Sequence, residues 1–284
     1  MIRLKNEFLT VSVALRGAEL QSVRCAGQEY LWQGDPAFWA ERAPVLFPVC
    51  GALRDDRYVL DGTEYEMPKH GFAKSLDFEV EYHDGNSAVL LAEATETTRR
   101  FFPFSFQLRV TYQLTGRKIR VTYDILNQDD KTAWFAIGAH EGWSLPGGLS
   151  EYRLVFPQEE QFQNRVLAAG GLTTEAWETI APAGNSLPLS PELFAPGTLV
   201  FDRLRSRSCV LCRRDGCRAV RVSFEDFRNL LIWTVPGSKF VCLEPWSALP
   251  DPSDHDYDIT HKPGVISAWP NETVTRSHTL EILA

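Results

Sequence analysis

The amino-acid sequence predicts an all-β fold, an antiparallel sandwich or barrel with few short helices. Short runs of alternating apolar and polar residues recur along the 284 residues, with turn-forming residues between them. The sequence shows no long amphipathic helix, no repeat of fixed period and no low-complexity linker. Many short strands with frequent turns are typical of sandwiches and barrels, which can exceed roughly 200 residues in one domain. We therefore expect a single domain over residues 1–284.

The first half of the sequence contains a predicted strand at Phe8–Ala14 and four predicted hairpins. Each hairpin joins two runs across a turn that contains Gly, and Asp61-Gly62 is a strong tight-turn pattern. The paired runs are Leu20–Cys25 with Glu29–Gln33, Tyr58–Leu60 with Thr63–Tyr65, Phe78–Tyr82 with Ala88–Ala92, and Phe104–Leu114 with Lys118–Leu126. Asp35-Pro36 resembles an N-cap followed by proline at the first helical position, which predicts one short helix through Arg42.

The second half continues the strand pattern around one loop-rich stretch. Residues 156–196 hold many Gly, Pro, Asn and Ser residues, which predicts mainly loops there. The predicted strands of this half are Ala133–Ile137, Tyr152–Val155, Thr198–Phe201, Cys209–Leu211, Ala219–Phe224, Leu230–Thr234, Phe240–Leu243 and Thr273–Leu283.

Composition and charge exclude several classes of protein. Hydrophobic residues make up 44% of the chain and charged residues 23%, which supports a sizeable core. The net charge of −8 argues against non-specific nucleic-acid binding and against a polybasic membrane-surface protein. No apolar run reaches the ~20 residues of a spanning helix, and the N-terminus has no apolar signal core. We expect a cytoplasmic monomer or homodimer without nucleic-acid or membrane partners.

Six cysteines are present, and a chain of this length without a signal peptide is expected to keep them reduced. Cys209 and Cys212 have the C-x-x-C spacing of zinc sites. In a strand, however, residues three apart point to opposite faces, and only Cys217 is near enough to join them. Because structural zinc needs four ligands, we expect no metal here.

The most informative segment for function is Lys239–Trp246. Its apolar run Phe240–Leu243 suits a strand buried on both faces, and Pro245, which cannot donate to a sheet ladder, is expected to mark the strand's end. Glu244 would then lie at the rim of the core, where desolvation raises the pKa of a carboxyl and makes it a better general base. On these eight residues alone, an exposed strand-end Glu paired with an Arg is the simpler interpretation.

Three other segments place polar side chains on loops or at strand ends. Arg54 and Arg57 lie in a polar turn after Gly51, where arginines bind hydroxyls or a carboxylate, although solvated charges fit the same pattern. His70 lies on a loop between a proline and a glycine, where a surface histidine is the simpler interpretation. His140 ends a predicted strand among small residues that allow close approach of a ligand, and a hydrogen-bonded structural histidine is its alternative.

The sequence gives no support to calcium binding or to several common enzyme chemistries. Asp254–Asp258 begins like a calcium loop, but Ile259 replaces the glycine at the sixth position and Val265 the glutamate at the twelfth. The sequence has no G-x-S-x-G elbow, P-loop or G-x-G-x-x-G after a strand, so serine hydrolysis, nucleotide hydrolysis and Rossmann redox chemistry have no visible basis.

Taken together and in this order, several segments resemble the aldose 1-epimerase (galactose mutarotase-like) superfamily, and within it the LacX-like bacterial proteins. The matching segments span nearly the whole chain. They are Phe47–Leu53 with Tyr58, Lys69–Ala73, Ile137–His140, Trp233–Pro236, Cys242–Trp246, Lys262–Ile266 and Pro270–Glu272. The resemblance implies a large antiparallel β-supersandwich with an open sugar-binding cleft, and an isomerase that interconverts the α and β anomers of an aldose without a cofactor.

Carried over residue by residue, the resemblance makes Glu244 the general base, His140 the general acid and His70 the assisting histidine. Such a reaction takes a proton from the anomeric hydroxyl and gives one to the ring oxygen. A carboxylate near His140 is expected to hold that imidazole charged near neutral pH. The candidate aromatic residues for stacking on the sugar, each also a core candidate, are Trp246, Trp143, Phe72 and Trp233.

The sequence departs from the family pattern at three places. Ala52 stands where the family has an arginine, and Arg54 or Arg57 is the candidate replacement. Glu141 adds a carboxylate beside the acid, where the family has a proline. The sugar-binding Asp of galactose mutarotases has no clear match in residues 196–202, so the sequence does not identify the sugar.

Two alternatives to a free-hexose epimerase stay open. A sugar 6-phosphate epimerase would need clustered Arg or Lys at the cleft rim, and Arg54, Arg57 and Lys74 allow one. A non-catalytic carbohydrate-binding or sensing protein would need no matched acid and base, which makes it the weaker alternative. The sequence also leaves open whether the acidic loop Asp251–Asp258 covers the cleft.

Overall fold

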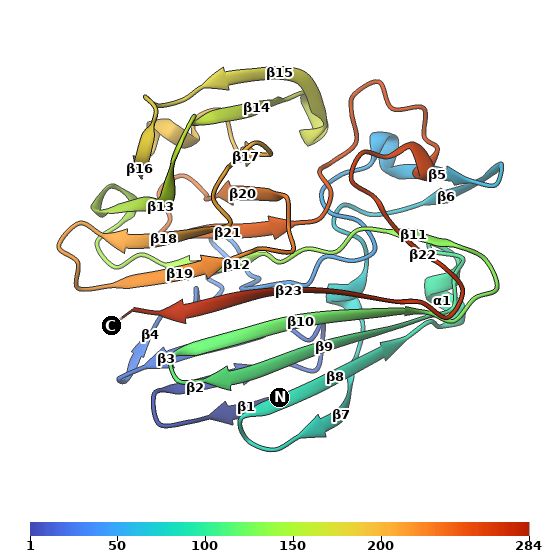
Figure 1. Ribbon diagram of the computed structural model, residues 1–284, viewed down its shortest axis with the longest axis horizontal. Helices are drawn as coiled ribbons and strands as arrows, with labels where there is room; N and C mark the ends of the chain where they lie inside the picture. The colour runs from blue at the N-terminus through green and yellow to red at the C-terminus, as the bar shows by residue number, and fades with distance from the viewer. Residues whose placement is uncertain (284) are drawn as a thin grey trace.

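The computed structural model describes residues 1–283 and is built almost entirely of antiparallel strands, as the sequence predicts (Figure 1). Its largest element is a sheet of nine strands. In spatial order these strands are β16 (Gly184–Pro188), β13 (Tyr152–Glu160), β18 (Ser208–Arg213), β19 (Ala219–Ser223), β23 (Thr273–Ile282), β10 (Lys118–Asn127), β9 (Phe106–Thr115), β8 (Ser87–Glu93) and β7 (Glu79–His83).

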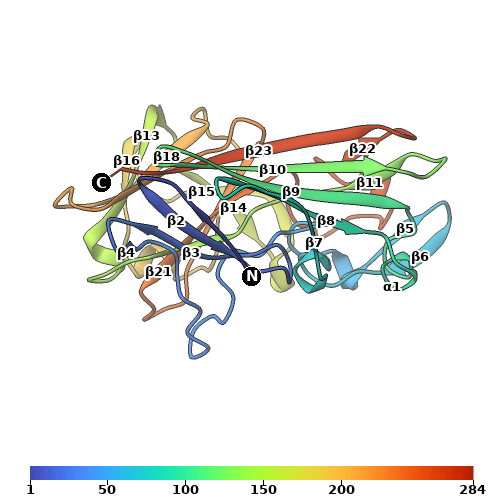
Figure 2. The same cartoon turned by 90° about the horizontal axis from the view of Figure 1, so that it is seen from below.

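Two four-stranded sheets lie on the other side of the sandwich core. Figure 2 shows the long strands β23, β10 and β9 along one side of the body, with β2, β3 and β21 below them. The first small sheet has the order β1 (Ile2–Lys5), β2 (Leu9–Val13), β3 (Leu20–Cys25) and β4 (Gln28–Glu29). The second has the order β12 (Glu141–Ser144), β21 (Phe240–Trp246), β20 (Asn229–Trp233) and β17 (Leu199–Phe201).

The remaining elements are short. Three two-stranded ribbons are β5 (Arg57–Leu60) with β6 (Thr63–Glu66), β11 (Ala133–Phe135) with β22 (Ile266–Ala268), and β14 (Gln163–Leu167) with β15 (Thr173–Thr179). The helical segments are α1 (Glu96–Arg99), η1 (Arg54–Asp56), η2 (Ala73–Ser75), η3 (Leu149–Glu151), η4 (Ala169–Gly171), η5 (Glu192–Phe194) and η6 (Ile259–His261). No helix within residues 1–283 is long and apolar enough to cross a membrane.

Side-chain alternation explains why the large sheet packs as it does. Along β9 and β10 every second side chain is buried, and the register pairs buried Val110 with buried Tyr123, and Leu108 with Ile125. These side chains form one face that packs on the apolar faces of the small sheets. β21 differs because all seven of its residues are buried, which indicates that both of its faces are covered.

The helix predicted after Asp35 is absent. Asp35 does begin one turn, because the N–H of Trp39 donates to its carbonyl at 2.8 Å. The chain then leaves the helical path, since the carbonyl of Trp39 accepts from the indole of Trp32 at 2.8 Å and the N–H of Arg42 donates to Glu19 at 2.7 Å. Tertiary hydrogen bonds thus replace the intrahelical ones, and a loop carries Trp39 over the second small sheet.

Residues 156–196 contain more strand than the sequence predicts. β13 continues to Glu160, and β14, β15 and β16 all lie within this stretch. β14 and β15 keep few buried positions and alternate poorly, so they lack the apolar pattern on which the prediction relied. β12 also escaped prediction, because its four residues follow His140 without a turn between them.

Candidate active site

Glu244 and His140 are cross-strand neighbours. β12 pairs with β21 through Glu141 and Leu243, and beyond the end of β12 Gly138 pairs with Trp246 in the same register. Continuing this register places His140 opposite Glu244, so the two side chains leave the same face of the sheet close together.

The sequence suggested that Pro245 ends β21, but the strand continues through it because the hydrogen-bond ladder adjusts to the proline. Pro245 pairs with Leu230 of β20, and its carbonyl accepts from the N–H of Ala139 at 3.0 Å. The carbonyl of Ala139 cannot receive an N–H from proline and instead accepts from the indole Nε1 of Trp246 at 3.1 Å. This substitution satisfies the backbone and fixes the Trp246 ring beside the two acid/base residues.

The buried pair His140–Glu244 is the centre of the candidate site. His140 Nε2 lies 3.2 Å from Glu244 Oε2, and the two residues are 8% and 1% exposed. His140 Nδ1 and Glu244 Oε1 have no hydrogen-bond partner within residues 1–283. Buried polar atoms are normally hydrogen-bonded, so two unpartnered atoms on neighbouring residues indicate a place that a polar ligand completes.

His70 reaches the same place from the loop between β6 and η2. Its backbone has a φ of 69°, and its N–H donates to the carbonyl of Gly51 at 2.9 Å. The N–H of Gly51 in turn donates to His70 Nδ1 at 3.1 Å, which assigns the ring proton to Nε2. The ring centroid lies 5.5 Å from that of His140 and 5.3 Å from that of Trp246. His70 is therefore a pre-oriented hydrogen-bond donor.

These three residues line one cavity of about 260 Å³. Leu231, Glu244 and Trp246 form part of its floor, since alternation along β20 and β21 turns them to the same face. The apolar part of the lining includes Trp39, Leu46, Leu167, Leu231, Trp233 and Trp246. The polar part includes Glu41, Lys69, His70, Lys74, His140 and Glu244. Aromatic faces beside a few convergent polar groups are typical of small-molecule sites.

Burial shifts the acid/base groups toward their uncharged forms. It raises the pKa of Glu244 well above its usual range, and the carboxylate of Glu141 adds to this while Lys69 opposes it. The prediction of a raised pKa at Glu244 is confirmed in direction. Burial also lowers the pKa of His140 to about 3, with smaller effects in the same direction from Lys69 and Lys74. The prediction of a charged His140 is wrong, because loss of water outweighs the nearby carboxylate.

His70 is held neutral as well. Burial lowers its pKa to about 2, and the neighbouring His140, Lys69 and Lys74 act in the same direction. A neutral ring keeps its Nε2 proton across the physiological range, so the donor role of His70 does not depend on pH there.

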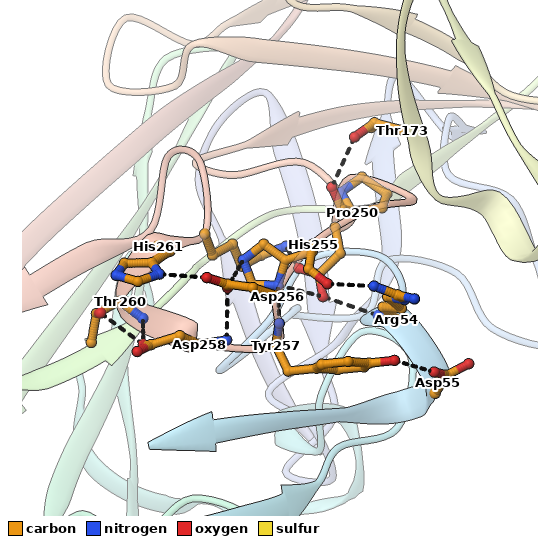
Figure 3. Close-up of polar contacts among 12 residues, drawn as sticks. Arg54, Asp55, Thr173, Pro250, His255, Asp256, Tyr257, Asp258, Thr260 and His261 are labelled. Carbon is orange, nitrogen blue, oxygen red and sulfur yellow. Dashed lines mark hydrogen bonds and ion pairs between the residues drawn. The ribbon is translucent and has the colours of Figure 1, made fainter. Parts of the chain in front are cut away.

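Arg54 and Arg57 lie outside the cavity, which corrects the expectation that they contact substrate. The Arg54 guanidinium donates to the carbonyl of His255 at 2.7 Å and stacks 4.8 Å from the Tyr257 ring (Figure 3). Arg57 forms an ion pair with Glu64 at 2.6 Å. Its guanidinium carbon also lies 4.5 Å from the centroid of the same Tyr257 ring. Both arginines hold the chain near β5 to the loop after β21, and neither is among the described residues that line the cavity.

Trp143 and Phe72 are also placed in the core and not in the cavity. Trp143 has no exposed surface, because alternation along β12 turns it away from the face of His140 and toward the nine-stranded sheet. Phe72 packs between Phe47 and Phe106, each 6.2 Å away between ring centroids. Of the aromatic candidates, Trp246 and Trp233 line the cavity.

Sequence reasoning did not name Trp39 or Lys69, which both line the cavity, whereas it did name Lys74 as a candidate for the cleft rim. Trp39 lies 5.0 Å from the His140 ring between centroids, on the loop that was expected to be a helix. Lys69 precedes His70 and lines the cavity, and Lys74 pairs there with Glu41 at 2.9 Å. Lys69 adjoins His70 in the sequence, and that proximity was the available indication of its place.

The acidic loop Asp251–Asp258 is anchored beside the cavity. Pro250 lines the cavity, whereas no residue from 251 to 258 does within the described chain. The buried Asp251 carboxylate accepts from Lys262 Nζ at 2.7 Å and from the backbone N–H of Arg54 at 3.0 Å. Figure 3 shows Asp256 of this loop in contact with His261 of η6, 2.8 Å apart. The loop therefore braces the wall that Ala52 and Pro250 form.

Comparisons with known proteins agree with the fold. A family model described as aldose 1-epimerase matches residues 1–178. The chain is 33% identical over 296 residues to the plasmid-encoded protein LacX of Lactococcus lactis subsp. lactis, and each protein is covered to 99%. The chromosomal LacX protein of the same organism shows the same identity and coverage.

Two solved structures share the fold over their whole length. One is a galactose mutarotase related enzyme from Lactobacillus acidophilus, with a TM-score of 0.93, 29% identity, and coverage of 100% of this chain and 97% of that one. The other is a galactose mutarotase-like protein from Lactobacillus casei ATCC 334, with a TM-score of 0.94, 29% identity and 99% coverage of both chains. On the family match and the full-length similarity to LacX, the chain belongs to the aldose 1-epimerase family.

Proposed function

We propose that this protein is an aldose 1-epimerase that interconverts the α and β anomers of a small free sugar. One observation carries the proposal: a buried carboxyl and an imidazole, 3.2 Å apart, line a cavity that a small ligand can enter. Anomer exchange needs one base and one acid at neighbouring oxygen atoms, and this pair supplies both.

The proton count of the pair fits the reaction. Burial favours the state in which Glu244 and His140 together hold one proton and no net charge. With the sugar bound, the shared proton moves from Glu244 to His140 across their contact, which leaves Glu244 a carboxylate. Glu244 then takes the proton of the anomeric hydroxyl while His140 gives its added proton to the ring oxygen. The C1–O5 bond breaks and an open-chain aldehyde forms. After rotation about the C1–C2 bond, the same transfers in reverse close the ring on the other face.

His70 is proposed to hold the sugar in position. Its Nε2 proton is fixed by the Gly51 contact and is available to a sugar oxygen. Trp39, Trp233 and Trp246 supply apolar faces for the C–H side of a sugar ring. A cavity of about 260 Å³ is below the roughly 300–1,000 Å³ of sites for drug-sized ligands, which favours a monosaccharide over a longer chain.

A phosphorylated sugar is a second candidate substrate, favoured by two lysines. Lys69 and Lys74 both line the cavity, and Lys69 is exposed. Ammonium groups bind phosphate through charge-assisted hydrogen bonds. The Glu41 partner of Lys74 weakens this candidate, because it already neutralises one of the two charges.

The test is anomer exchange measured by polarimetry or by NMR on fresh α-anomers of glucose, galactose and glucose 6-phosphate. The enzyme should accelerate exchange of at least one sugar over the buffer rate. Glu244→Gln should lose about 10²–10⁴ of that acceleration while still binding the sugar. Glu225→Gln, an exposed carboxylate outside the cavity lining, is the matched control and should keep full activity.

Two outcomes would contradict the proposal. Absence of acceleration for a panel of free and phosphorylated aldoses would point to a non-catalytic sugar-binding protein, particularly if a sugar binds equally well to the wild type and to Glu244→Gln. An unchanged rate in Glu244→Gln would remove the assigned base.

A further inference from the structure

Cys242 lies beside the acid/base pair on the same face of β21. Residues 242 and 244 of a strand point to the same side, and the register places Cys242 opposite Gly142 on β12 and Trp233 on β20. Since His140 falls opposite Glu244, the three side chains form one cross-strand cluster. The Trp39 ring packs over the backbone of Gly142, since a Cβ on Gly142 would lie only 2.8 Å from it.

The donor atoms of this cluster are close enough to share a metal ion. One ligand atom each from His140, Cys242 and Glu244 lies within 4.8 Å of the others, and all three residues are buried. In a tetrahedral zinc site, bond lengths of 2.0–2.3 Å put ligand atoms roughly 3.3–3.7 Å apart. Side-chain movements of about 1 Å therefore bring the cluster to that spacing.

A second observation points to a ligand at this position. His140 Nδ1 and Glu244 Oε1 are buried without a hydrogen-bond partner, and both residues line the cavity. An ion entering through the cavity thus meets, at His140 and Glu244, two donor atoms without a partner among residues 1–283, whereas buried Cys242 does not line the cavity. Water from the cavity can take the fourth position, as in open three-ligand zinc sites.

The donor set selects the kind of ion. Imidazole, thiolate and carboxylate together suit Zn²⁺, whereas Mg²⁺ and Ca²⁺ prefer oxygen ligands alone. A divalent cation bound to one thiolate, one carboxylate and one neutral imidazole has no net charge, which is the condition under which a buried ion is tolerated. We propose that His140, Cys242 and Glu244 form a three-ligand site for a thiophilic divalent cation of the Zn²⁺ class, and that its occupancy blocks the acid/base pair.

The proton balance follows from the ligands. Binding of the cation displaces the thiol proton of Cys242 and the proton shared by His140 and Glu244, and both leave to the solvent. Neither residue can then exchange a proton with a sugar. The metal-binding part of this inference stands on the cluster alone, and only the inhibition rests on the proposed epimerase function.

The experiment uses the full-length protein, dialysed against a chelator and then titrated with Co²⁺ as a spectroscopic probe for Zn²⁺. Because Cys212 is partly exposed and Cys217 exposed, both are first replaced by Ser to remove other accessible thiols. In this background we expect a thiolate-to-cobalt charge-transfer band that Zn²⁺ abolishes by displacement. Cys242→Ala should lose the band and bind Zn²⁺ at least about 10-fold more weakly, the lower end of the losses seen for outer-shell partners. Cys209→Ala, which removes another buried thiol, should behave like the parent.

The outcomes separate the two proposals. A missing band, or a band that persists in Cys242→Ala, overturns the metal site whatever the activity. A band that depends on Cys242 in a protein without epimerase activity supports the metal site and contradicts only the proposed function. If the protein is an active epimerase, saturating Zn²⁺ should abolish activity in the parent and in Cys209→Ala. The Zn²⁺ concentration that halves the activity of Cys242→Ala should be at least about 10-fold higher than in the parent. Full activity at saturating Zn²⁺ would overturn the inhibitory role.

Discussion

His278 Nε2 lies 2.8 Å from Glu141 Oε1 in the interior of the sandwich. Glu141 follows His140 in the chain and points to the other face of β12, where β23 of the nine-stranded sheet presents His278. The two side chains are 4% and 0% exposed, and Tyr123 stacks on His278 at 5.9 Å between ring centroids. This polar contact links the sheet that carries the candidate site to the large sheet behind it.

The first prediction concerns the stability that depends on this pair. Replacing His278 by Ala leaves Glu141 buried without a partner, and breaking a buried pair typically lowers the free energy of unfolding by about 3–5 kcal/mol. Replacing both residues by apolar ones, Glu141→Leu with His278→Phe, should cost clearly less, because no uncompensated polar group remains. Urea unfolding followed by tryptophan fluorescence measures both. A double variant less stable than His278→Ala would contradict this account.

The second prediction tests the positioning role of His70. Asn tolerates the left-handed backbone that His70 adopts at φ 69°, so His70→Asn should fold normally. Loss of one neutral hydrogen bond to the sugar corresponds to about 0.5–1.5 kcal/mol, or roughly a 2- to 13-fold lower kcat/KM. The pH profile of the rate should keep its shape, since a neutral donor does not titrate there. A loss as large as that of Glu244→Gln would instead make His70 a proton-transfer residue.

The third prediction concerns the pH dependence of the rate, whose fall at high pH should shift when Lys69 is replaced. The rate should fall at low pH only toward about 3, where His140 gains a proton. It should fall at high pH as the pair loses its proton through the raised pKa of Glu244. Because the charge of Lys69 lowers the pKa of Glu244, Lys69→Met should move the alkaline limb to higher pH. Initial rates corrected for buffer catalysis measure both limbs, and a shift to lower pH would refute the assignment.

The sequence allowed three residues of the candidate site to be predicted, but it did not allow two candidate arginines to be placed. Glu244, His140 and His70 could be selected because each stands next to a Pro or small residues at a strand end or on a loop, in segments that resemble the family. Arg54 and Arg57 could not be placed, since a turn in the sequence does not reveal which side it faces. The ring of Tyr257, which contacts both guanidinium groups, lies two hundred residues away.

The errors in the fold have a similar origin. Asp35-Pro36 is a sound helix start, but contacts of Trp39 and Arg42 with distant residues decide the path of the loop. Pro245 is normally a strand terminator, and the Trp246 indole supplies the hydrogen bond that proline lacks. In each place a long-range hydrogen bond overrides a local preference, and local preference is all that a single sequence displays.

The fourth prediction distinguishes the two substrate classes. If the substrate carries a phosphate, Lys74→Met and Lys69→Met should each raise KM for the phosphorylated sugar by roughly 10- to 150-fold, since hydrogen bonds to charged groups contribute about 1.5–3 kcal/mol. The KM for the unphosphorylated sugar should change little. Lys118→Met, on β10 and outside the cavity lining, is the control. Equal effects on both sugars would exclude a phosphate subsite at these lysines.

The last prediction separates backbone strain from crowding at the His70 loop. Gly71 and Gly62 both have positive φ, 70° and 76°. A Cβ on Gly71 would lie 2.2 Å from the carbonyl oxygen of Phe47, whereas a Cβ on Gly62 meets nothing within 4 Å. Gly62→Ala should therefore lower the free energy of unfolding by about 1–2 kcal/mol, the cost of the left-handed conformation alone, and leave activity intact.

Gly71→Ala carries the same strain and adds a clash with backbone that cannot rotate away. It should be destabilised by more than Gly62→Ala, and the shift of the loop should displace His70 from its contact with Gly51. We expect a lower kcat/KM in the fraction that stays folded, with denaturant unfolding and anomer exchange measured on the same preparations. Equal stability of the two variants would show that the loop moves freely, and the pre-oriented donor role of His70 would then have no structural basis.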